Sequence, residues 1–505
     1  MSAMGMTIYD LLRRSASMYP SANAIVHEGG TLSYAELSSR VDRLAAGFAG
    51  LGLAHGTRVC VLAQNHLEYF ELYFACAKLG LVVYPVNWRL TATEIGHVLT
   101  RAEPAVMVFD QEMATLTAEV RELESASKVS HWYCIDGAAD NAGAIADLYV
   151  HGDSPQTSTS ADDIAVVIST AAVDVIPRGA ALTSANIAAN NVQIMMSMGL
   201  KNDECHLLCL PMFHITGLGF AWAMIHCGGC NVITTKFDPA AAVSLIDKHN
   251  VTLLGSFPPL LATLLDQADA AGSKLESLRH VAGLEAPDTA KRLQDSTNAT
   301  FWIGFGQSET SGFVSVQPYF ERPGSAGKPA ALSQVELRDD DGQTVPVGEV
   351  GEIVVRGPVV MHSYFGQPDV TEHTFRDGWH HTGDLGRFDE DGYLFYAGRK
   401  PEKELIKPGG ENVYPHEVES VIDEMEAVRG VCVFGVADPK WGEAVKAVIE
   451  ADADVISADD VREYVGSKIG RFKRPSKVEF VAAIARADDG SVDREAVKAE
   501  FGDQT

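Results

Sequence analysis

The chain has 505 residues, of which 46% are hydrophobic and 21% charged, a composition that excludes a disordered chain and favours at least two folded domains. Its 40 basic and 68 acidic side chains give a net charge of −28, which disfavours nucleic acid and anionic membrane surfaces as partners. Residues 1–20 do not match a signal or transit peptide, and the longest apolar stretches are too short to span a bilayer. We therefore expect a cytoplasmic protein that does not bind membranes.

Strand-like and helix-like segments alternate along most of the chain. An amphipathic segment predicts a helix over 33–51. Short apolar runs rich in β-branched residues predict strands at 58–62, 81–86, 105–109 and 164–169. This alternation favours an α/β fold with parallel strands. The polar segment 136–163 is predicted to be a surface connection.

A passage rich in glycine and turn residues, 386–415, separates this pattern from a smaller one. The smaller pattern begins with a predicted helix at 416–425 and a strand at 430–435. We therefore predict a large N-terminal domain, residues 1–399, and a small α+β C-terminal domain, residues 400–505.

Four of the eight cysteines lie in two close pairs: Cys205 with Cys209, and Cys227 with Cys230. Such spacing also occurs in zinc sites. However, both pairs flank apolar runs, and a free cysteine packs as a small hydrophobic residue. We favour buried thiols over a metal site and expect no disulfide in a cytoplasmic protein.

Four motifs share one family order: LPMFHITGLG from Leu210, GFGQSET from Gly304, WHHTGDLGRFDEDGYLFYAGR from Trp379, and IKPGGENVYPHEVE from Ile406. With them, nearly the whole chain resembles the adenylate-forming superfamily of acyl-CoA synthetases. The resemblance implies a large domain of layered sheets and helices that binds an acyl-adenylate, and a small mobile C-terminal domain. In that family, a carboxylate and ATP first give acyl-AMP, and the thiol of coenzyme A then displaces AMP.

The resemblance also implies a role for each matching residue at the nucleotide. Asp384 would accept hydrogen bonds from the ribose hydroxyls, with Arg399 as its partner, although an aspartate that caps a turn is the structural alternative. Phe305 would lie against the adenine, Ser308 would contact the α-phosphate, and Glu309 is a possible Mg²⁺ ligand. The other residues expected to bind the acyl-adenylate are Gly283, Leu284, Glu285, Ala286, Gly306, Gln307 and Tyr396.

The resemblance also implies roles for three sets of residues in the reaction with the CoA thiol. His214 would lie at the mouth of the acyl pocket beside the reacting carbonyl, unless it is a buried structural histidine. Gly409 and Gly410 would line the pantetheine tunnel, where absent side chains permit close passage, unless they form an ordinary turn. Arg471 and Lys473 could bind the phosphates of CoA, although a solvated basic face explains them equally well.

The sequence departs from the family at the loop that binds the outer phosphates of ATP. The family pattern Thr-Ser-Gly-Thr-Thr-Gly aligns with Thr170, Ala171, Ala172, Val173, Asp174 and Val175, and Arg178 follows where the family has lysine. Both glycines and every interior hydroxyl are missing, although such a loop needs them to turn donors toward phosphate. Asp174 adds a negative charge. We therefore expect weak binding of the outer phosphates of ATP.

A second departure lies near the C-terminus. Ser491 follows Gly490 at the position where the family has the lysine that bridges the carboxylate and the α-phosphate during adenylation. Losing a charged group of this kind costs roughly 10²–10³ in rate. Adenylation is therefore expected to be lost or strongly impaired.

Neither departure should affect the second half-reaction, because acyl-AMP has no β or γ phosphate. We therefore expect thioesterification of a preformed acyl-adenylate by CoA, with a separate enzyme supplying the adenylate and the need for Mg²⁺ left open. The pattern is similar to the non-adenylating acyl-CoA synthetases of platensimycin- and platencin-type diterpenoid biosynthesis, which implies a bulky diterpenoid acyl group. Two alternatives stay open: a complete ATP-dependent ligase, which Glu309 favours, and a silent protein that binds acyl-adenylate or acyl-CoA. A carrier-protein thiol in place of CoA is a minor variant.

Overall fold

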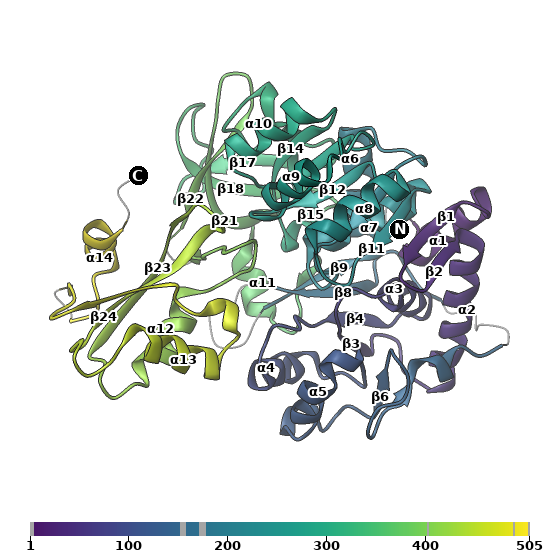
Figure 1. The fold of residues 1–505 in the computed structure, drawn as a ribbon, viewed down its shortest axis with the longest axis horizontal. Coiled ribbons are helices and arrows are strands. Elements are labelled where there is room, and N and C mark those ends of the chain that lie inside the picture. Colours follow the sequence, from purple (N-terminus) through teal and green to yellow (C-terminus); the bar gives the residue numbers. More distant parts are fainter. Residues whose placement is uncertain (1–4, 152–157, 171–177, 401–402, 488–489, 503–505) are drawn as a thin grey trace.

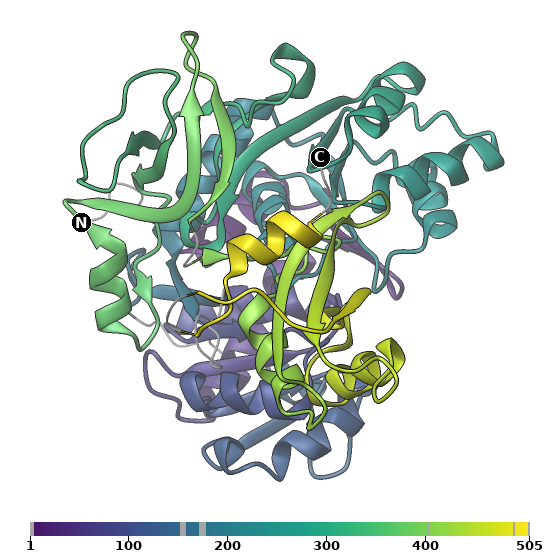
Figure 2. The ribbon, with the colours of Figure 1, turned by 90° about the vertical axis from the view of Figure 1, so that its left-hand side faces the viewer.

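The computed structural model describes residues 5–151, 158–170, 178–400, 403–487 and 490–502 (Figure 1). A large N-terminal part, purple to green in Figure 1, fills the right and upper side of the molecule. A small C-terminal part, green to yellow, lies on the left, and Figure 2 turns it toward the viewer.

Two mixed sheets form the centre of the large part. Within the described residues, one has the order β16-β15-β14-β13-β12-β10-β11-β1-β2 and the other β19-β9-β8-β4-β3-β5-β6-β7. The strands of the first are β1 (Asn23–His27), β2 (Gly30–Ser33), β10 (Cys205–Leu208), β11 (Cys230–Ile233), β12 (Leu253–Ser256), β13 (His280–Gly283), β14 (Thr300–Gln307), β15 (Gly312–Pro318) and β16 (Lys328–Pro329). Those of the second are β3 (Arg58–Leu62), β4 (Val82–Pro85), β5 (Val106–Phe109), β6 (His131–Cys134), β7 (Gly143–Ala144), β8 (Ile164–Ser169), β9 (Gly179–Thr183) and β19 (Ser363–Tyr364).

Helices cover both faces of these sheets, which buries the continuous apolar runs of the central strands. The largest core contains residues of both sheets together with α1 (Ile8–Met18), α2 (Tyr34–Gly50), α3 (Leu67–Leu79), α6 (Ser184–Met198) and α7 (Ile215–Cys227). A second core joins the eight-stranded sheet to α4 (Ala92–Ala102) and α5 (Ala114–Arg121). A third joins the nine-stranded sheet to α8 (Pro239–His249), α9 (Leu260–Ala271) and α10 (Pro287–Ser296).

A third sheet and the small domain complete the fold. The third sheet comprises β17 (Gln334–Arg338), β18 (Gly351–Arg356), β20 (Phe375–Arg376), β21 (Trp379–Phe388) and β22 (Leu394–Arg399), beside α11 (Pro368–Thr374). The small domain has its own core and contains α12 (Pro415–Asp423), β23 (Gly430–Asp438), β24 (Gly442–Glu450), α13 (Ala458–Lys468), β25 (Lys477–Val481) and α14 (Arg494–Phe501). The predicted fold class is therefore confirmed, while the domain boundary after Arg399 stays a prediction.

Two expectations about the sheets and connections need correction. β8 pairs antiparallel with β9, and β14 pairs antiparallel with β15, so neither large sheet is purely parallel. An apolar run does not distinguish the two directions, which depend on the connection that follows. The segment 136–163 is not all surface, because Ile145 and Leu148 of the 3₁₀ helix η3 (Ile145–Leu148) are buried.

The paired cysteines are free thiols. Cys209 and Cys227 are buried, while Cys205 and Cys230 are register partners on neighbouring strands. Among the described residues, no group of three or more His, Cys, Asp or Glu is arranged to hold a metal ion. Over the same residues, no helix has the length and apolar character that a membrane span requires.

Candidate active site

Asp384 is the centre of a polar cluster at the junction of the large and small domains. It is buried on β21 and faces Arg399 of β22 in the antiparallel register. Its Oδ1 lies 3.2 Å from Arg399 Nε and accepts a hydrogen bond from the Tyr396 hydroxyl at 3.1 Å. Gln307 donates to Oδ2, and Lys403 Nζ lies 3.4 Å from that oxygen. The structure thus brings four predicted residues together and adds Lys403, which the sequence analysis missed.

Two aromatic rings lie beside this cluster, and a glycine with a positive φ ends the strand β13 that neighbours β14. The rings of Phe305 and Tyr396 are stacked, with centroids 6.3 Å apart and an interplanar angle of 28°. Tyr396 is 44% exposed, so its ring face can receive a planar base. Gly283, at the end of β13, has φ +151°, and a Cβ there would lie 1.8 Å from the Ser256 carbonyl oxygen. Only glycine fits this turn.

Two of the residues after Gly283 contact Ser256 of β12. Leu284 donates its backbone N–H to the Ser256 carbonyl at 3.2 Å, and its side chain is exposed. Glu285 is buried and accepts a hydrogen bond from the Ser256 hydroxyl at 2.6 Å. Burial raises the pKa of Glu285 to about 7. The buried Glu285 carboxyl therefore holds this turn against β12 through Ser256.

Ser308 and Glu309 are buried in the 3₁₀ helix η4 (Ser308–Thr310) that follows Gly306 and Gln307 on β14. Glu309 Oε1 accepts a hydrogen bond from the Tyr364 hydroxyl at 2.9 Å. The Arg178 guanidinium lies over the Tyr364 ring, 5.4 Å from its centroid. Glu309 supplies one carboxylate, so a Mg²⁺ ion here fits only if the nucleotide phosphates provide further ligands.

His214 begins α7 as its N-cap. Its Nδ1 lies 2.8 Å from the Thr216 hydroxyl and accepts a hydrogen bond from the Thr216 backbone N–H at 3.3 Å, which favours the neutral tautomer with its proton on Nε2. Burial, together with the positive charges of Lys407 and Arg89, lowers the pKa of His214 to about 4. Burial and Arg399 also lower the pKa of Lys407. Near neutral pH the imidazole is therefore an uncharged donor beside a lysine of the C-terminal domain.

Gly409 and Gly410 lie where the small domain meets the large one. Both have left-handed backbone angles, φ +60° and φ +87°. A Cβ on Gly409 would lie 2.9 Å from the Trp441 ring, and one on Gly410 would lie 3.2 Å from the Phe257 ring. Gly409 and Gly410 therefore lie in close contact with a tryptophan of the small domain and a phenylalanine of the large domain, a junction that we call the glycine passage.

The prediction that Lys473 binds a CoA phosphate needs correction. It is 5% exposed, and its ammonium lies 2.6 Å from Glu94 Oε1 and also contacts Glu417. One buried and one partly buried carboxylate hold this charge, so Lys473 does not offer it to a CoA phosphate in this arrangement. Its neighbour Arg471 is exposed, and its contact with CoA stays a prediction.

Of the two sequence departures, the structure describes Ser491 and only the two ends of the phosphate loop. Ala171, Ala172, Val173, Asp174 and Val175 lie outside the described residues. The Thr170 backbone N–H donates to the Arg178 carbonyl at 2.8 Å, which fixes the two ends of that loop. Ser491 is exposed and precedes α14, which Figure 1 places at the outer end of the small domain.

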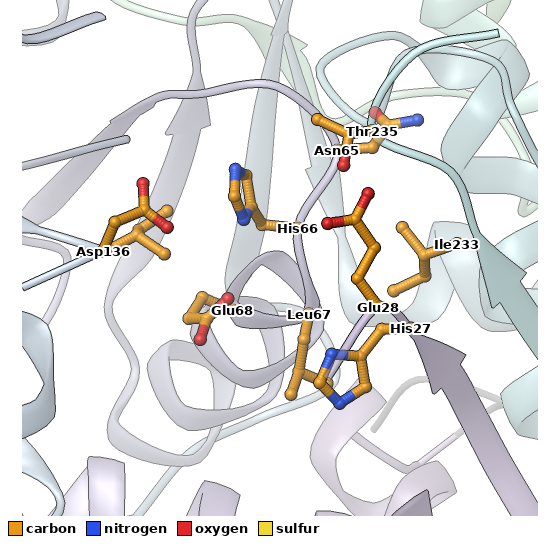
Figure 3. Close-up of a pocket in the computed structure, with 10 residues that line it drawn as sticks. His27, Glu28, Asn65, His66, Leu67, Glu68, Asp136, Ile233 and Thr235 are labelled. Carbon is orange, nitrogen blue, oxygen red and sulfur yellow. The ribbon is translucent and has the colours of Figure 1, made fainter. Parts of the chain in front are cut away.

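A separate hollow lies at the carboxyl ends of β1, β3, β5, β6 and β11. Its volume is about 780 Å³. Figure 3 shows an adjoining pocket of about 220 Å³, whose lining includes His27, Glu28, His66 and Asp136. None of the predicted site residues is among those that line it. This hollow is distinct from the cluster around Asp384.

Comparisons with known proteins identify this arrangement. The model of the "AMP-binding enzyme" family matches residues 12–365, and that of the "AMP-binding enzyme C-terminal domain" matches residues 417–490. The chain is 34% identical to a feruloyl-CoA synthase from Amycolatopsis sp, over 97% of this chain and 98% of that protein. It is 29% identical to a long-chain-fatty-acid–CoA ligase from Mycobacterium tuberculosis, over 97% and 98% of the two chains.

Two solved complexes of o-succinylbenzoate CoA synthetase from Bacillus subtilis, each 26% identical to this chain, match to different degrees. The double mutant bound to its product analogue OSB-NCoA gives a TM-score of 0.84 over 98% of this chain and 99% of that chain. The complex with the acyl-adenylate intermediate OSB-AMP gives 0.70 over 98% of each chain. The chain belongs to the AMP-binding enzyme family, within the acyl-CoA ligases of the adenylate-forming superfamily.

Proposed function

We propose that this protein catalyses the second half of an acyl-CoA ligase reaction, in which the thiol of CoA displaces AMP from a preformed acyl-adenylate. A separate adenylating enzyme would supply the acyl-AMP. The observation that carries the proposal is the position of the Gly409–Gly410 loop, between Trp441 and Phe257, with Lys407 close enough to His214 to lower its pKa. The higher TM-score against the product-analogue complex supports the same domain arrangement.

The side chains suit thiol attack on an acyl-adenylate. The neutral His214 ring would donate from Nε2 to the acyl carbonyl oxygen, which gains negative charge as sulfur attacks. Lys407 Nζ would donate hydrogen bonds to the incoming sulfur or to the departing AMP phosphate. The attack forms a carbon–sulfur bond, breaks the bond between the carbonyl carbon and the phosphate oxygen, and releases the thiol proton to solvent. Asp384 and Arg399 would hold the ribose throughout.

A complete ATP-dependent ligase is the second candidate. The relatives bear the names of complete ligases, and Glu309 with the nearby Arg178 gives this chain one carboxylate and one cation near the phosphate position. Against it stand a phosphate loop without glycines and the exposed Ser491 in place of lysine. A diterpenoid carboxylic acid is the acyl group that the sequence resemblance proposes, and a ferulate-like acid is the one that the feruloyl-CoA synthase relative proposes.

Restoring both the glycine-rich phosphate loop and the lysine at position 491 should restore adenylation, whereas restoring only one of them should not. We expect no exchange of pyrophosphate into ATP by the wild type, by Ser491→Lys, or by a variant with Thr-Ser-Gly-Thr-Thr-Gly at residues 170–175. The combined variant should recover exchange, because the lysine and the phosphate loop act on one transition state. The measurement is radiolabelled pyrophosphate exchange over a panel of acids. Exchange in the Ser491→Lys variant alone would show that the loop is intact and would contradict the proposal.

A further inference from the structure

Lys473 of the small domain lies in a buried contact with the large domain. It ends the 3₁₀ helix η7 (Arg471–Lys473), and both it and Glu94 of α4 are less than a tenth exposed. The ammonium lies 2.6 Å from Glu94 Oε1 and also contacts Glu417 of α12. Burial alone would lower the pKa of Lys473, but the two carboxylates outweigh it and raise that pKa. The lysine therefore stays charged although it is buried.

The other carboxylate oxygen of Glu94, Oε2, accepts hydrogen bonds from both domains. In the capping box of α4 it accepts hydrogen bonds from the Thr91 N–H at 2.7 Å and the Thr91 hydroxyl at 3.0 Å. The same oxygen accepts the Gly470 N–H of the small domain at 3.0 Å. One side chain thus closes a helix end of the large domain and binds both the backbone and a side chain of the small domain.

This ion-pair cluster, defined as Glu94, Glu417, Gly470 and Lys473, is linked to the glycine passage. Arg89, five residues before Glu94, lies 2.5 Å from Glu411, and Glu411 directly follows Gly410. A Cβ on Gly470 would also lie 3.0 Å from the Arg89 carbonyl oxygen. The segment from Arg89 to Glu94 therefore contacts the small domain both at the cluster and beside the passage.

We propose that Glu94 and Lys473 are positioning residues that keep the small domain in the orientation where Gly409 and Gly410 face the acyl-adenylate. This inference rests on the proposed function and adds the element that selects the orientation. A buried ion pair contributes little net stability, yet separating its partners is costly, so its best-attested role is to fix one arrangement. A domain that rotated for adenylation would have to break this cluster in every turnover. A chain that has lost adenylation has no such need.

Glu94→Gln tests the inference from the large domain. Glutamine at this position still serves a capping box, so α4 keeps its cap, but the charge opposite Lys473 is lost. If the variant holds the productive orientation only a tenth of the time, KM for CoA rises roughly tenfold. Neither kcat at saturating CoA nor the affinity for AMP should change. Hydrogen exchange by mass spectrometry should accelerate in the peptide that contains Gly470.

Glu36→Gln is the matched control, because Glu36 holds the same capping-box position in α2, where it accepts from the Ser33 N–H at 2.8 Å, and is exposed. It should leave both readouts unchanged. Lys473→Gln, made from the other side of the contact, should match Glu94→Gln.

Equal KM for CoA and equal exchange in Glu94→Gln and the wild type would overturn the inference, as would equal effects of Glu94→Gln and Glu36→Gln. If the wild type makes no thioester from any acyl-AMP, the proposed function fails, and the exchange readout still decides on the cluster. Faster exchange at Gly470 in Glu94→Gln would then support the cluster, and unchanged exchange would overturn it.

Discussion

Gly409→Trp should abolish thioester formation while leaving acyl-AMP binding intact. Even a Cβ at this position would lie 2.9 Å from the Trp441 ring, so an indole must either fill the passage or push the domains apart. A displacement of about 1 Å at a reacting centre can cost 10²-fold in rate, and we expect kcat/KM for CoA to fall by at least that much. Stopped-flow or quenched assays with synthetic acyl-AMP and CoA measure the loss. Binding of AMP, measured by calorimetry, should not change.

The control must separate blockage from backbone strain. Gly342 also has a left-handed backbone, φ +77°, but a Cβ there would meet nothing within 4 Å. Gly342→Trp therefore carries the same conformational cost in an open turn and should retain activity. Wild-type rates in Gly409→Trp would remove this loop from the path of the thiol.

Asp384→Asn should weaken AMP binding by two to three orders of magnitude. The carboxylate is the common partner of Arg399, Tyr396, Gln307 and Lys403, and in the proposed complex it would receive the ribose hydroxyls. Hydrogen bonds to a charged group contribute about 1.5–3 kcal/mol each; at the lower end of that range, about 1.5–2 kcal/mol each, losing two of them corresponds to roughly 10²–10³ in affinity. The amide also turns a donor toward neighbours that are themselves donors. Calorimetric titration with AMP measures the change.

Glu352→Gln is the matched control for this variant. Glu352 lies on the neighbouring strand β18, is buried, and holds His381 at 2.9 Å and Lys400 at 3.1 Å. Burial raises its pKa, but the hydrogen bonds from His381 and Lys400 outweigh burial and lower that pKa to about 2. Glu352→Gln also removes a buried charge near the Asp384 cluster, yet the affinity for AMP should fall less than tenfold. Equal losses in the two variants would give Asp384 a structural role only.

Local patterns were sufficient to predict several elements and part of the site. The β-branched runs at 58–62 and 164–169 gave the bounds of β3 and β8, because central strands are short, apolar and bounded by turns. The motif residues Gln307, Asp384, Tyr396 and Arg399 meet in one cluster. Their meeting follows from the pairing of β21 with β22 and from the end of β14 beside them.

Contacts between the domains could not be predicted from such patterns. In the sequence, Lys473 belongs to a run of basic residues, but its buried partner Glu94 is 379 positions away in the chain. Lys403 and Lys407 carry no local signal beyond a charge in a turn-rich passage, and only the docking of the small domain brings them to Asp384 and His214. Burial and pairing of a charge depend on the tertiary arrangement, which a single sequence window does not contain.

One paired assay decides whether this protein carries out only the second half-reaction. Purified wild-type protein receives either synthetic acyl-AMP with CoA, or the free acid with ATP, Mg²⁺ and CoA, and acyl-CoA is followed by mass spectrometry. The panel of acids includes a diterpenoid acid and ferulic acid. We predict acyl-CoA from acyl-AMP alone, at a rate at least 10² times that of the ATP arm, because the lost lysine removes that much stabilisation by itself. Comparable rates in the two arms would contradict the account and make the protein a complete ATP-dependent ligase.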